Sequence, residues 1–220
     1  MTSSANRRTR LLSARLYFVT DAATDVHVLR EALAGGVDML QLRDPTLDDD
    51  ELVAAAASFR AVCDEHGALF WLNDRPDLAL RAGADGVHLG QDDMTPADAR
   101  DLLGPDVLIG LSTHSPEQLE RGIAAGADQL SVGPVWETPT KPGRPAAGLE
   151  YVRHAARVQP PVPWFAIGGI DAHNVQEVVA AGAQRAVVVR ALRHAPDPRA
   201  AAADLRSALT GPRSTVGTAQ

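Results

Sequence analysis

A recurring motif decides the fold, and its clearest copy, Ala82-Gly83-Ala84-Asp85, runs directly into the apolar segment 86–89. Similar motifs begin at Gly35 (Gly-Gly-Val-Asp), Ala125 (Ala-Gly-Ala-Asp) and Ala181 (Ala-Gly-Ala-Gln), each before another short apolar segment. A glycine with positive φ can end a helix, and the small residue after it lets the chain enter a buried strand. We therefore interpret each copy as the link from a helix to the next strand.

The spacing of the motif predicts the number of strands. Its glycines lie 43 to 56 residues apart, which is too long for one strand–helix unit and right for two. The eight apolar segments expected as strands are 15–20, 39–42, 68–73, 86–89, 108–112, 129–132, 164–168 and 185–189. The helical patterns between them include 48–66, 95–103, 115–125 and 171–181.

Strict alternation of strand and helix predicts a parallel sheet in an α/β protein. Eight such units in about 200 residues predict a single-domain TIM (β/α)8 barrel. Thr95-Pro96 and Ser115-Pro116 support the helix assignments, because each pairs a capping residue with a proline at the first helical position. An open doubly wound sheet is the alternative, and it is disfavoured because no G-x-G-x-x-G motif opens the first helix.

Composition limits the partners of the chain. Its 220 residues carry a formal net charge of −7, which argues against a nonspecific grip on nucleic acid. No apolar run approaches the roughly 18 residues of a membrane span, and the single cysteine, Cys63, excludes a disulfide framework. We expect a cytoplasmic protein with disordered tails at residues 1–14 and 211–220 around a barrel domain at 15–210. The Arg- and Ser-rich start also faintly resembles a transit peptide.

Polar residues gather where the expected strands end, which is where barrels of this kind place their active sites. The segments in question are Gln41-Leu42-Arg43-Asp44, Asn73-Asp74-Arg75, Gly90-Gln91-Asp92-Asp93, Ser112-Thr113-His114, the loop 133–148, Gly168-Gly169-Ile170 and Val189-Arg190. Because the carboxyl ends of parallel strands meet at one end of a barrel, we expect these side chains to share one site.

Six motifs in this order resemble the thiamine-phosphate synthase family, over about residues 15–209. They are Gln41-Leu42-Arg43, Asn73-Asp74, the run 83–93, Ser112-Thr113-His114, the segment 133–141 and Ile167-Gly168-Gly169-Ile170. The resemblance implies a Mg²⁺-dependent transferase of thiamine biosynthesis. It would join 4-amino-2-methyl-5-(diphosphooxymethyl)pyrimidine to 4-methyl-5-(2-phosphoethyl)thiazole, or to its 2-carboxy form, giving thiamine phosphate and diphosphate. The implied mechanism is dissociative, through a carbocation-like pyrimidine.

The resemblance also implies a role for each candidate residue. Asp74 and Asp93 would hold the Mg²⁺, a hard cation that binds one or two carboxylates, with Asp92 as a second choice. The residues implied for the pyrimidine diphosphate are Gln41, Arg43, Asn73, Ser112 and Lys141, of which Arg43, Ser112 and Lys141 are the catalytic candidates. The residues implied for the thiazole phosphate are Thr138, Pro139, Thr140, Gly169, Val189 and Arg190.

The residue types of Lys141 and Arg43 also support their roles independently of the resemblance. Lys141 is the single lysine beside 20 arginines, which indicates that the function of this position requires a compact ammonium group. Arg43 suits a bidentate clamp on a diphosphate. Plainer interpretations stay open: a salt bridge of Arg43 to Asp44 or Asp74, chance retention of Lys141, and helix caps or solvated loop charges for the aspartates.

The sequence departs from the family pattern at two positions. Pro45 stands where the family commonly has a lysine, so we expect weaker pyrimidine binding or compensation by Arg75. Arg190 stands where a serine is common, and its guanidinium either grips the thiazole phosphate or pairs with Asp171. We expect His88 to be structural, and His114 is a candidate helper near the site.

Three other functions compete with the synthase. A thiazole tautomerase would lack the metal aspartates and the diphosphate clamp, and a sugar-phosphate epimerase would place histidines at the strand ends. A non-catalytic sensor of thiamine intermediates would bind without turnover.

The expected partners are small molecules, with no nucleic acid and no membrane. The sequence leaves the oligomeric state open, a homo-oligomer included.

Overall fold

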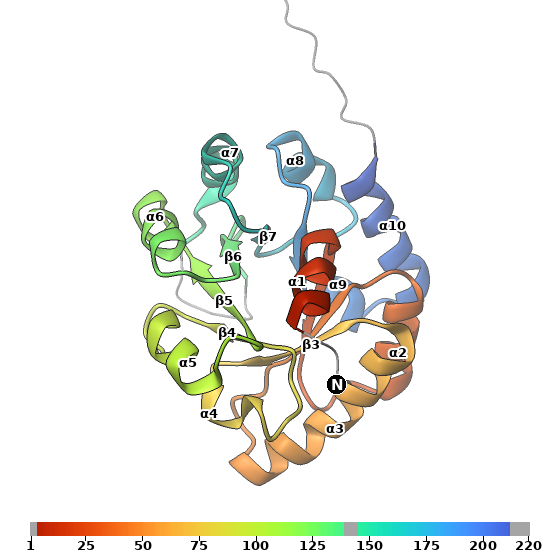
Figure 1. Ribbon diagram of the computed structural model, residues 1–220. Helices are drawn as coiled ribbons and strands as arrows, with labels where there is room; N and C mark the ends of the chain where they lie inside the picture. Colours follow the sequence, from red (N-terminus) through yellow and green to blue (C-terminus); the bar gives the residue numbers. More distant parts are fainter. Residues whose placement is uncertain (1–3, 139–144, 212–220) are drawn as a thin grey trace, which may run out of the picture.

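The computed structural model describes residues 4–138 and 145–211 and contains a closed barrel of eight parallel strands, each paired with its neighbours in chain order. Helices surround the barrel as an outer ring (Figure 1). The strands are β1 (Leu16–Thr20), β2 (Met39–Leu42), β3 (Leu69–Asn73), β4 (Gly86–Leu89), β5 (Leu108–Thr113), β6 (Gln129–Val132), β7 (Trp164–Ile167) and β8 (Ala186–Val188). The predicted TIM barrel is confirmed, and every predicted strand end lies within one residue of the observed end.

The helices of the described residues complete the alternating pattern. They are α1 (Ser4–Ser13), α2 (Val26–Ala34), α3 (Asp49–His66), α4 (Pro76–Ala79), α5 (Pro96–Leu103), α6 (Pro116–Ala124), α7 (Gly148–Val158), α8 (Val175–Ala180), α9 (Arg190–Arg193) and α10 (Pro198–Thr210). The predicted caps are confirmed, because Thr95 accepts a hydrogen bond from the Asp98 amide and Ser115 accepts one from the Gln118 amide. No helix of the described residues is long and apolar enough to cross a membrane.

One glycine in each copy of the recurring motif has the positive φ angle that the sequence predicts. Gly36, Gly83, Gly126 and Gly182 have φ angles of 106°, 65°, 75° and 105°, so each occupies the region that favours glycine. The turn that each one allows delivers the chain into the next strand of the barrel.

The aspartate of the motif has a role that the sequence did not reveal. Asp85 accepts hydrogen bonds from the Phe70 amide (2.9 Å), from Arg60 (2.7 Å) and from Arg7 (2.8 Å). Asp38 and Asp128 repeat this arrangement, each with a strand amide and an arginine. Each carboxylate therefore ties the start of one strand to its neighbour through a charge-assisted hydrogen bond.

Helix α1 corrects the expected disordered tail. Residues 4–13 form a helix over the centre of the barrel (Figure 1), and Leu11 is buried against the barrel interior. Arg7 pairs with Asp85, Arg8 pairs with Asp128, and Arg10 donates to the Gly67 carbonyl. These partners lie far away in sequence, so local pattern alone could not reveal the helix. The expected C-terminal tail lies outside the described residues from residue 212 on.

The interior of the barrel changes character along its axis. At the end covered by α1 it holds large apolar side chains, among them Met39, Leu69, Leu108 and Phe165. At the opposite end the last inward positions of β2 to β6 are polar, because alternate residues of each strand point inward: Gln41, Asn73, His88, Ser112 and Ser131. The inward positions of β1, β7 and β8 there are apolar. This polar end is the mouth at which the strands finish.

Candidate active site

A cavity of about 320 Å³ opens at the carboxyl ends of the strands. Eight of the residues predicted from the sequence line it: Gln41, Arg43, Asn73, Ser112, Thr138, Gly169, Val189 and Arg190. They come from six strands or the turns after them. The barrel thus brings together most of the side chains that the sequence suggested for one site.

Three predicted residues cannot be placed. Pro139, Thr140 and Lys141 lie outside the described residues. Thr138, the residue before them, lines the cavity, so this loop starts at the mouth of the barrel. The roles expected of the three residues stay predictions.

The two aspartates expected to bind metal lie beside the cavity and do not line it. The Asp74 amide donates to the His88 carbonyl (2.9 Å), and Asp74 has a φ of 59°, which is uncommon for a residue other than glycine. Asp93 accepts a hydrogen bond from the Gly90 amide (2.6 Å). These contacts hold both residues at the ends of the neighbouring strands β3 and β4.

The described residues contain no group of three or more histidine, cysteine or acidic side chains that could hold a metal ion. The predicted magnesium site therefore consists of two carboxylates at most. Asp92, the second choice, lines a separate hollow together with His114. A pair of carboxylates is a donor set that Mg²⁺ accepts, since this ion keeps waters and takes further oxygens from substrate phosphates.

Arg43 is partly buried and lines the cavity. Its Nε is buried without a hydrogen-bond partner among the described residues. The alternative salt bridge to Asp44 is not formed, since the Asp44 carboxylate accepts from Thr46 and from the Ala22 amide. A buried donor without a protein partner is unfavourable unless a ligand supplies an acceptor. This geometry fits the expected anion clamp.

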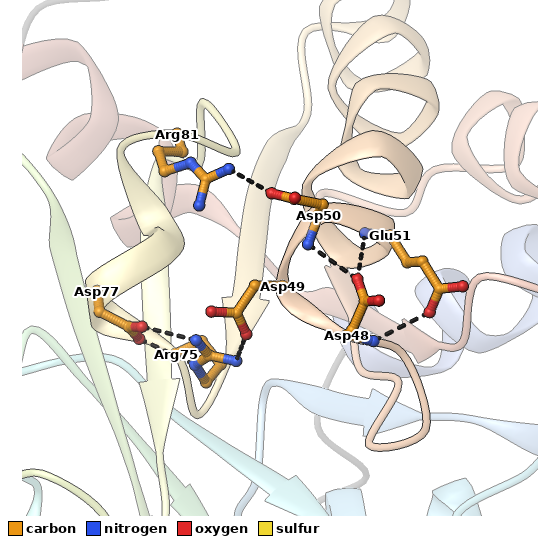
Figure 2. Close-up of polar contacts among 7 residues, drawn as sticks. All are labelled: Asp48, Asp49, Asp50, Glu51, Arg75, Asp77 and Arg81. Carbon is orange, nitrogen blue, oxygen red and sulfur yellow. Dashed lines mark hydrogen bonds and ion pairs between the residues drawn. The ribbon is translucent and has the colours of Figure 1, made fainter.

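Arg75, the residue expected to compensate for the lysine that Pro45 replaces, has two acidic partners. Its guanidinium is paired with Asp77 (2.7 Å) and Asp49 (2.6 Å), as Figure 2 shows. Arg75 is not among the residues that line the cavity. The same acidic segment starts helix α3, where Asp48 and Glu51 form a capping box. These acidic residues and Arg75 therefore stabilise local structure around the start of α3.

Several polar residues of the site were missed by sequence reasoning. Tyr17 accepts a hydrogen bond from Gln41 at the base of the cavity, and burial raises the pKa of the Tyr17 hydroxyl. His88, which we expected to be structural, lines the cavity and contacts Ser112 (Nε2–Oγ 2.9 Å). The signal that could have found both is the two-residue period, which places Tyr17 and His88 on the inner face of their strands.

The far side of the cavity is suited to a phosphate. Gly168 and Gly169 have φ angles of 107° and 69°, so the turn after β7 brings backbone close to the cavity. Arg190 also lines the cavity, and it makes no ion pair with Asp171 in the described structure. Its guanidinium is exposed and available to an anion.

The fold and site together define a (β/α)8-barrel enzyme that binds phosphorylated small molecules. A barrel interior, two guanidinium groups and a glycine-rich turn at one mouth are the features of that class. Comparison with known proteins identifies the family within it.

The model of the thiamine monophosphate synthase family matches residues 16–192. The chain is 54% identical over 207 residues to the thiamine-phosphate synthase of Thermobifida fusca, covering 92% of this chain and 95% of the relative. It is 55% identical over 180 residues to that of Thermus thermophilus, covering 82% and 86%. The chain belongs to the thiamine monophosphate synthase family.

Solved structures agree with this assignment. The thiamine phosphate pyrophosphorylase from Pyrococcus furiosus superposes with a TM-score of 0.82 at 34% identity, over 93% of this chain and 98% of that one. A 3-hexulose-6-phosphate synthase superposes with a TM-score of 0.63 at 22% identity, and that likeness shows the shared fold alone.

Proposed function

We propose that this protein joins the methylpyrimidine diphosphate to the thiazole phosphate and releases diphosphate and thiamine phosphate. With the 2-carboxy form of the thiazole, the carboxyl group would leave as CO₂, and its electron pair would stay on the ring carbon that is then protonated. One observation carries the proposal: eight residues implied by the family resemblance, from six strands, line one cavity. Membership of the family supports the same reaction. The two proposed partners are these small molecules. A cytoplasmic location and a homo-oligomer stay predictions from the sequence.

We infer that Asp74 and Asp93 hold a Mg²⁺ at the ends of β3 and β4. The donor set supports this, because two carboxylates leave coordination positions for diphosphate oxygens and water. When bound, the ion would neutralise part of the charge that develops on the departing diphosphate.

The side chains of the site have separate tasks in the proposed reaction. Arg43, with Lys141, would hold the diphosphate, while Gln41, Asn73 and Ser112 would orient the pyrimidine ring. Hydrogen bonds from side chains that the barrel holds in place would position both substrates at little further entropic cost.

The bond changes are a substitution at the pyrimidine methylene carbon. The bond from that carbon to the diphosphate oxygen breaks, and its electron pair leaves with the diphosphate. The electron-donating aminopyrimidine stabilises the cationic carbon, and the thiazole nitrogen then supplies the pair for the new C–N bond. The apolar walls of the cavity, Val19, Ile167 and Val187 among them, would keep water from the cationic carbon.

The thiazole phosphate is proposed to bind at the glycine turn and the start of α9. Gly169, Val189 and Arg190 line this part of the cavity, and Thr138, Pro139 and Thr140 would contribute from the loop after β6. A phosphate monoester suits backbone amides and hydroxyl groups beside one guanidinium.

The test is a two-substrate incubation with MgCl₂, followed by oxidation of the product to fluorescent thiochrome. Fluorescence is expected with both substrates and not when either one is omitted. Chelation of Mg²⁺ should abolish it, and readdition should restore it. No thiochrome from the complete mixture, with folded protein, would overturn the proposed function.

A further inference from the structure

Four polar side chains form a buried chain of hydrogen bonds at the base of the cavity. Gln129 Nε2 donates to Ser131 Oγ (3.1 Å), and Gln129 Oε1 lies 3.2 Å from His88 Nδ1. His88 Nε2 lies 2.9 Å from Ser112 Oγ. All four residues are buried. Of these four, only Ser112 belongs to the site that the family resemblance implies.

Gly110 makes room for this chain. In the barrel it is paired with His88 of β4 on one side and with Gln129 of β6 on the other. A Cβ at Gly110 would lie 2.5 Å from Gln129 Oε1 and 2.6 Å from His88 Nδ1. The contact between His88 and Gln129 is therefore possible only because residue 110 is a glycine. The space at Gly110 supports the assignment independently of the hydrogen bonds.

The chain of contacts fixes where each hydrogen lies. Because the Gln129 amide nitrogen donates to Ser131, its carbonyl oxygen faces His88, and a carbonyl oxygen only accepts. His88 Nδ1 must then carry a hydrogen; we assign the ring the neutral form, in which Nε2 is an acceptor. The Ser112 hydroxyl consequently donates its hydrogen to His88.

We propose that Gln129 and His88 are positioning residues that turn Ser112 into a hydrogen-bond acceptor toward the cavity. With its hydrogen committed to His88, Ser112 offers lone pairs to a ligand. The matching ligand group is an N–H donor. This deepens the proposed function, on which it rests: the site selects a pyrimidine that carries an exocyclic amino group.

The chemistry of the ring supports the match. In the proposed substrate the amino group is the only N–H donor on the ring, because both ring nitrogens are acceptors. In the corresponding 4-oxo pyrimidine a carbonyl oxygen replaces it and would face the lone pairs of Ser112. A site built around a hydrogen bond rejects an analogue that cannot form it.

The first test measures the tautomer of His88 in the ligand-free, full-length protein. Long-range ¹H–¹⁵N correlation spectra of ¹⁵N-histidine-labelled protein distinguish the two tautomers, and loss of signals in His88→Gln assigns them. We expect the hydrogen on Nδ1. A hydrogen on Nε2 would make Ser112 free to donate and would overturn the proposal. This measurement does not depend on the proposed function.

The second test measures binding of two unreactive ligands by calorimetry, the amino and 4-oxo forms of the hydroxymethylpyrimidine monophosphate. Wild type should bind the amino form about 10- to 100-fold more tightly, the usual effect of an unmatched buried polar group. In Gln129→Leu the tautomer is no longer fixed, so the preference should fall to within about threefold. Full preference in a folded Gln129→Leu protein would contradict the proposal.

Tyr151→Phe is the matched control. Tyr151 donates a buried hydrogen bond to Thr113 (2.7 Å), the neighbour of Ser112 on the opposite face of β5. Its loss should leave the preference unchanged. If wild type forms no thiochrome from the complete mixture of substrates and MgCl₂, the proposed function fails, whereas the His88 tautomer still decides the hydrogen-bond assignment. Equal binding of the two ligands to wild type would overturn the amino-group selection alone.

Discussion

Asp85→Ala should be one of the most destabilising single substitutions in the barrel. The Asp85 side chain is 3% exposed and binds two arginines that are themselves mostly buried, Arg7 at 17% and Arg60 at 22%. Removal of the carboxylate leaves both guanidinium groups and the Phe70 amide without this partner. Breaking a buried ion pair in this way costs about 3–5 kcal/mol.

Urea unfolding at pH 7 measures the effect. With a urea dependence of about 2–3 kcal/mol/M for a chain of this size, the midpoint should fall by roughly 1–2 M. Asp50→Ala is the matched control, because Asp50 pairs with Arg81 at the same 2.8 Å but is 90% exposed (Figure 2). Exposed pairs contribute little, so its midpoint should stay nearly unchanged.

The pH dependence gives a second check on the same carboxylate. Burial by itself would raise the pKa of Asp85, but hydrogen bonds from Arg60, the Phe70 amide and Arg7 lower it below its ordinary value. A lowered pKa in the folded state means that the stabilisation is complete above the unfolded pKa of about 3.9 and is lost as the pH falls below it. The difference between wild type and Asp85→Ala should therefore be constant from pH 7 to about pH 5 and shrink below about pH 4. Equal midpoints for Asp85→Ala and Asp50→Ala at pH 7 would refute the reasoning.

Four further predictions concern activity. Arg43→Lys should lower kcat/KM for the pyrimidine diphosphate by about 10- to 100-fold, because lysine cannot form the bidentate contact. Steady-state kinetics with the pyrimidine diphosphate as the varied substrate measure this loss. Asp74→Ala and Asp93→Ala should each cut turnover by orders of magnitude and raise the Mg²⁺ concentration for half-maximal rate, and unchanged Mg²⁺ titrations in both would remove the metal assignment. Arg190→Ser should raise KM for the thiazole phosphate about tenfold with little change for the pyrimidine, and equal KM values would place its guanidinium outside the phosphate site. Arg75→Ala should leave the KM for the pyrimidine diphosphate unchanged, since Asp49 and Asp77 hold its side chain away from the cavity; a large rise would restore it as the substitute cation.

The architecture could be predicted because its signals are local. Each helix or strand can be predicted from one local feature of the sequence: a glycine that ends a helix, an N-cap residue such as Thr95 or Ser115, or an apolar run. Their order then fixes a parallel closed barrel. Helix α1 escaped prediction because Arg7 and Arg8 are paired with Asp85 and Asp128, which only the folded barrel brings near.

The site could be predicted in part for a related reason. Strand ends are visible in the sequence, so Gln41, Arg43 and Ser112 were placed correctly at one cavity. Residues deeper in the barrel, such as Tyr17 and Gln129, cannot be distinguished in the sequence from other strand residues. Their roles come from partners on other strands, which no local pattern shows.

The difference between Arg43 and Arg75 makes the same point. Both follow an expected strand, and both looked able to meet a diphosphate. Only the structure shows that the acidic start of α3 binds Arg75, whereas Arg43 keeps its buried Nε without a partner among the described residues. Competing local charges therefore decide which of the two arginines lines the cavity.

The most direct test of the central claim counts both products of one reaction. Diphosphate and thiamine phosphate are quantified over time in the same mixture of protein, MgCl₂ and both substrates. The account predicts that the two appear together, in equal amounts, and that neither forms when the thiazole phosphate is left out. Diphosphate release without the thiazole, or rearrangement of the thiazole without the pyrimidine, would contradict it.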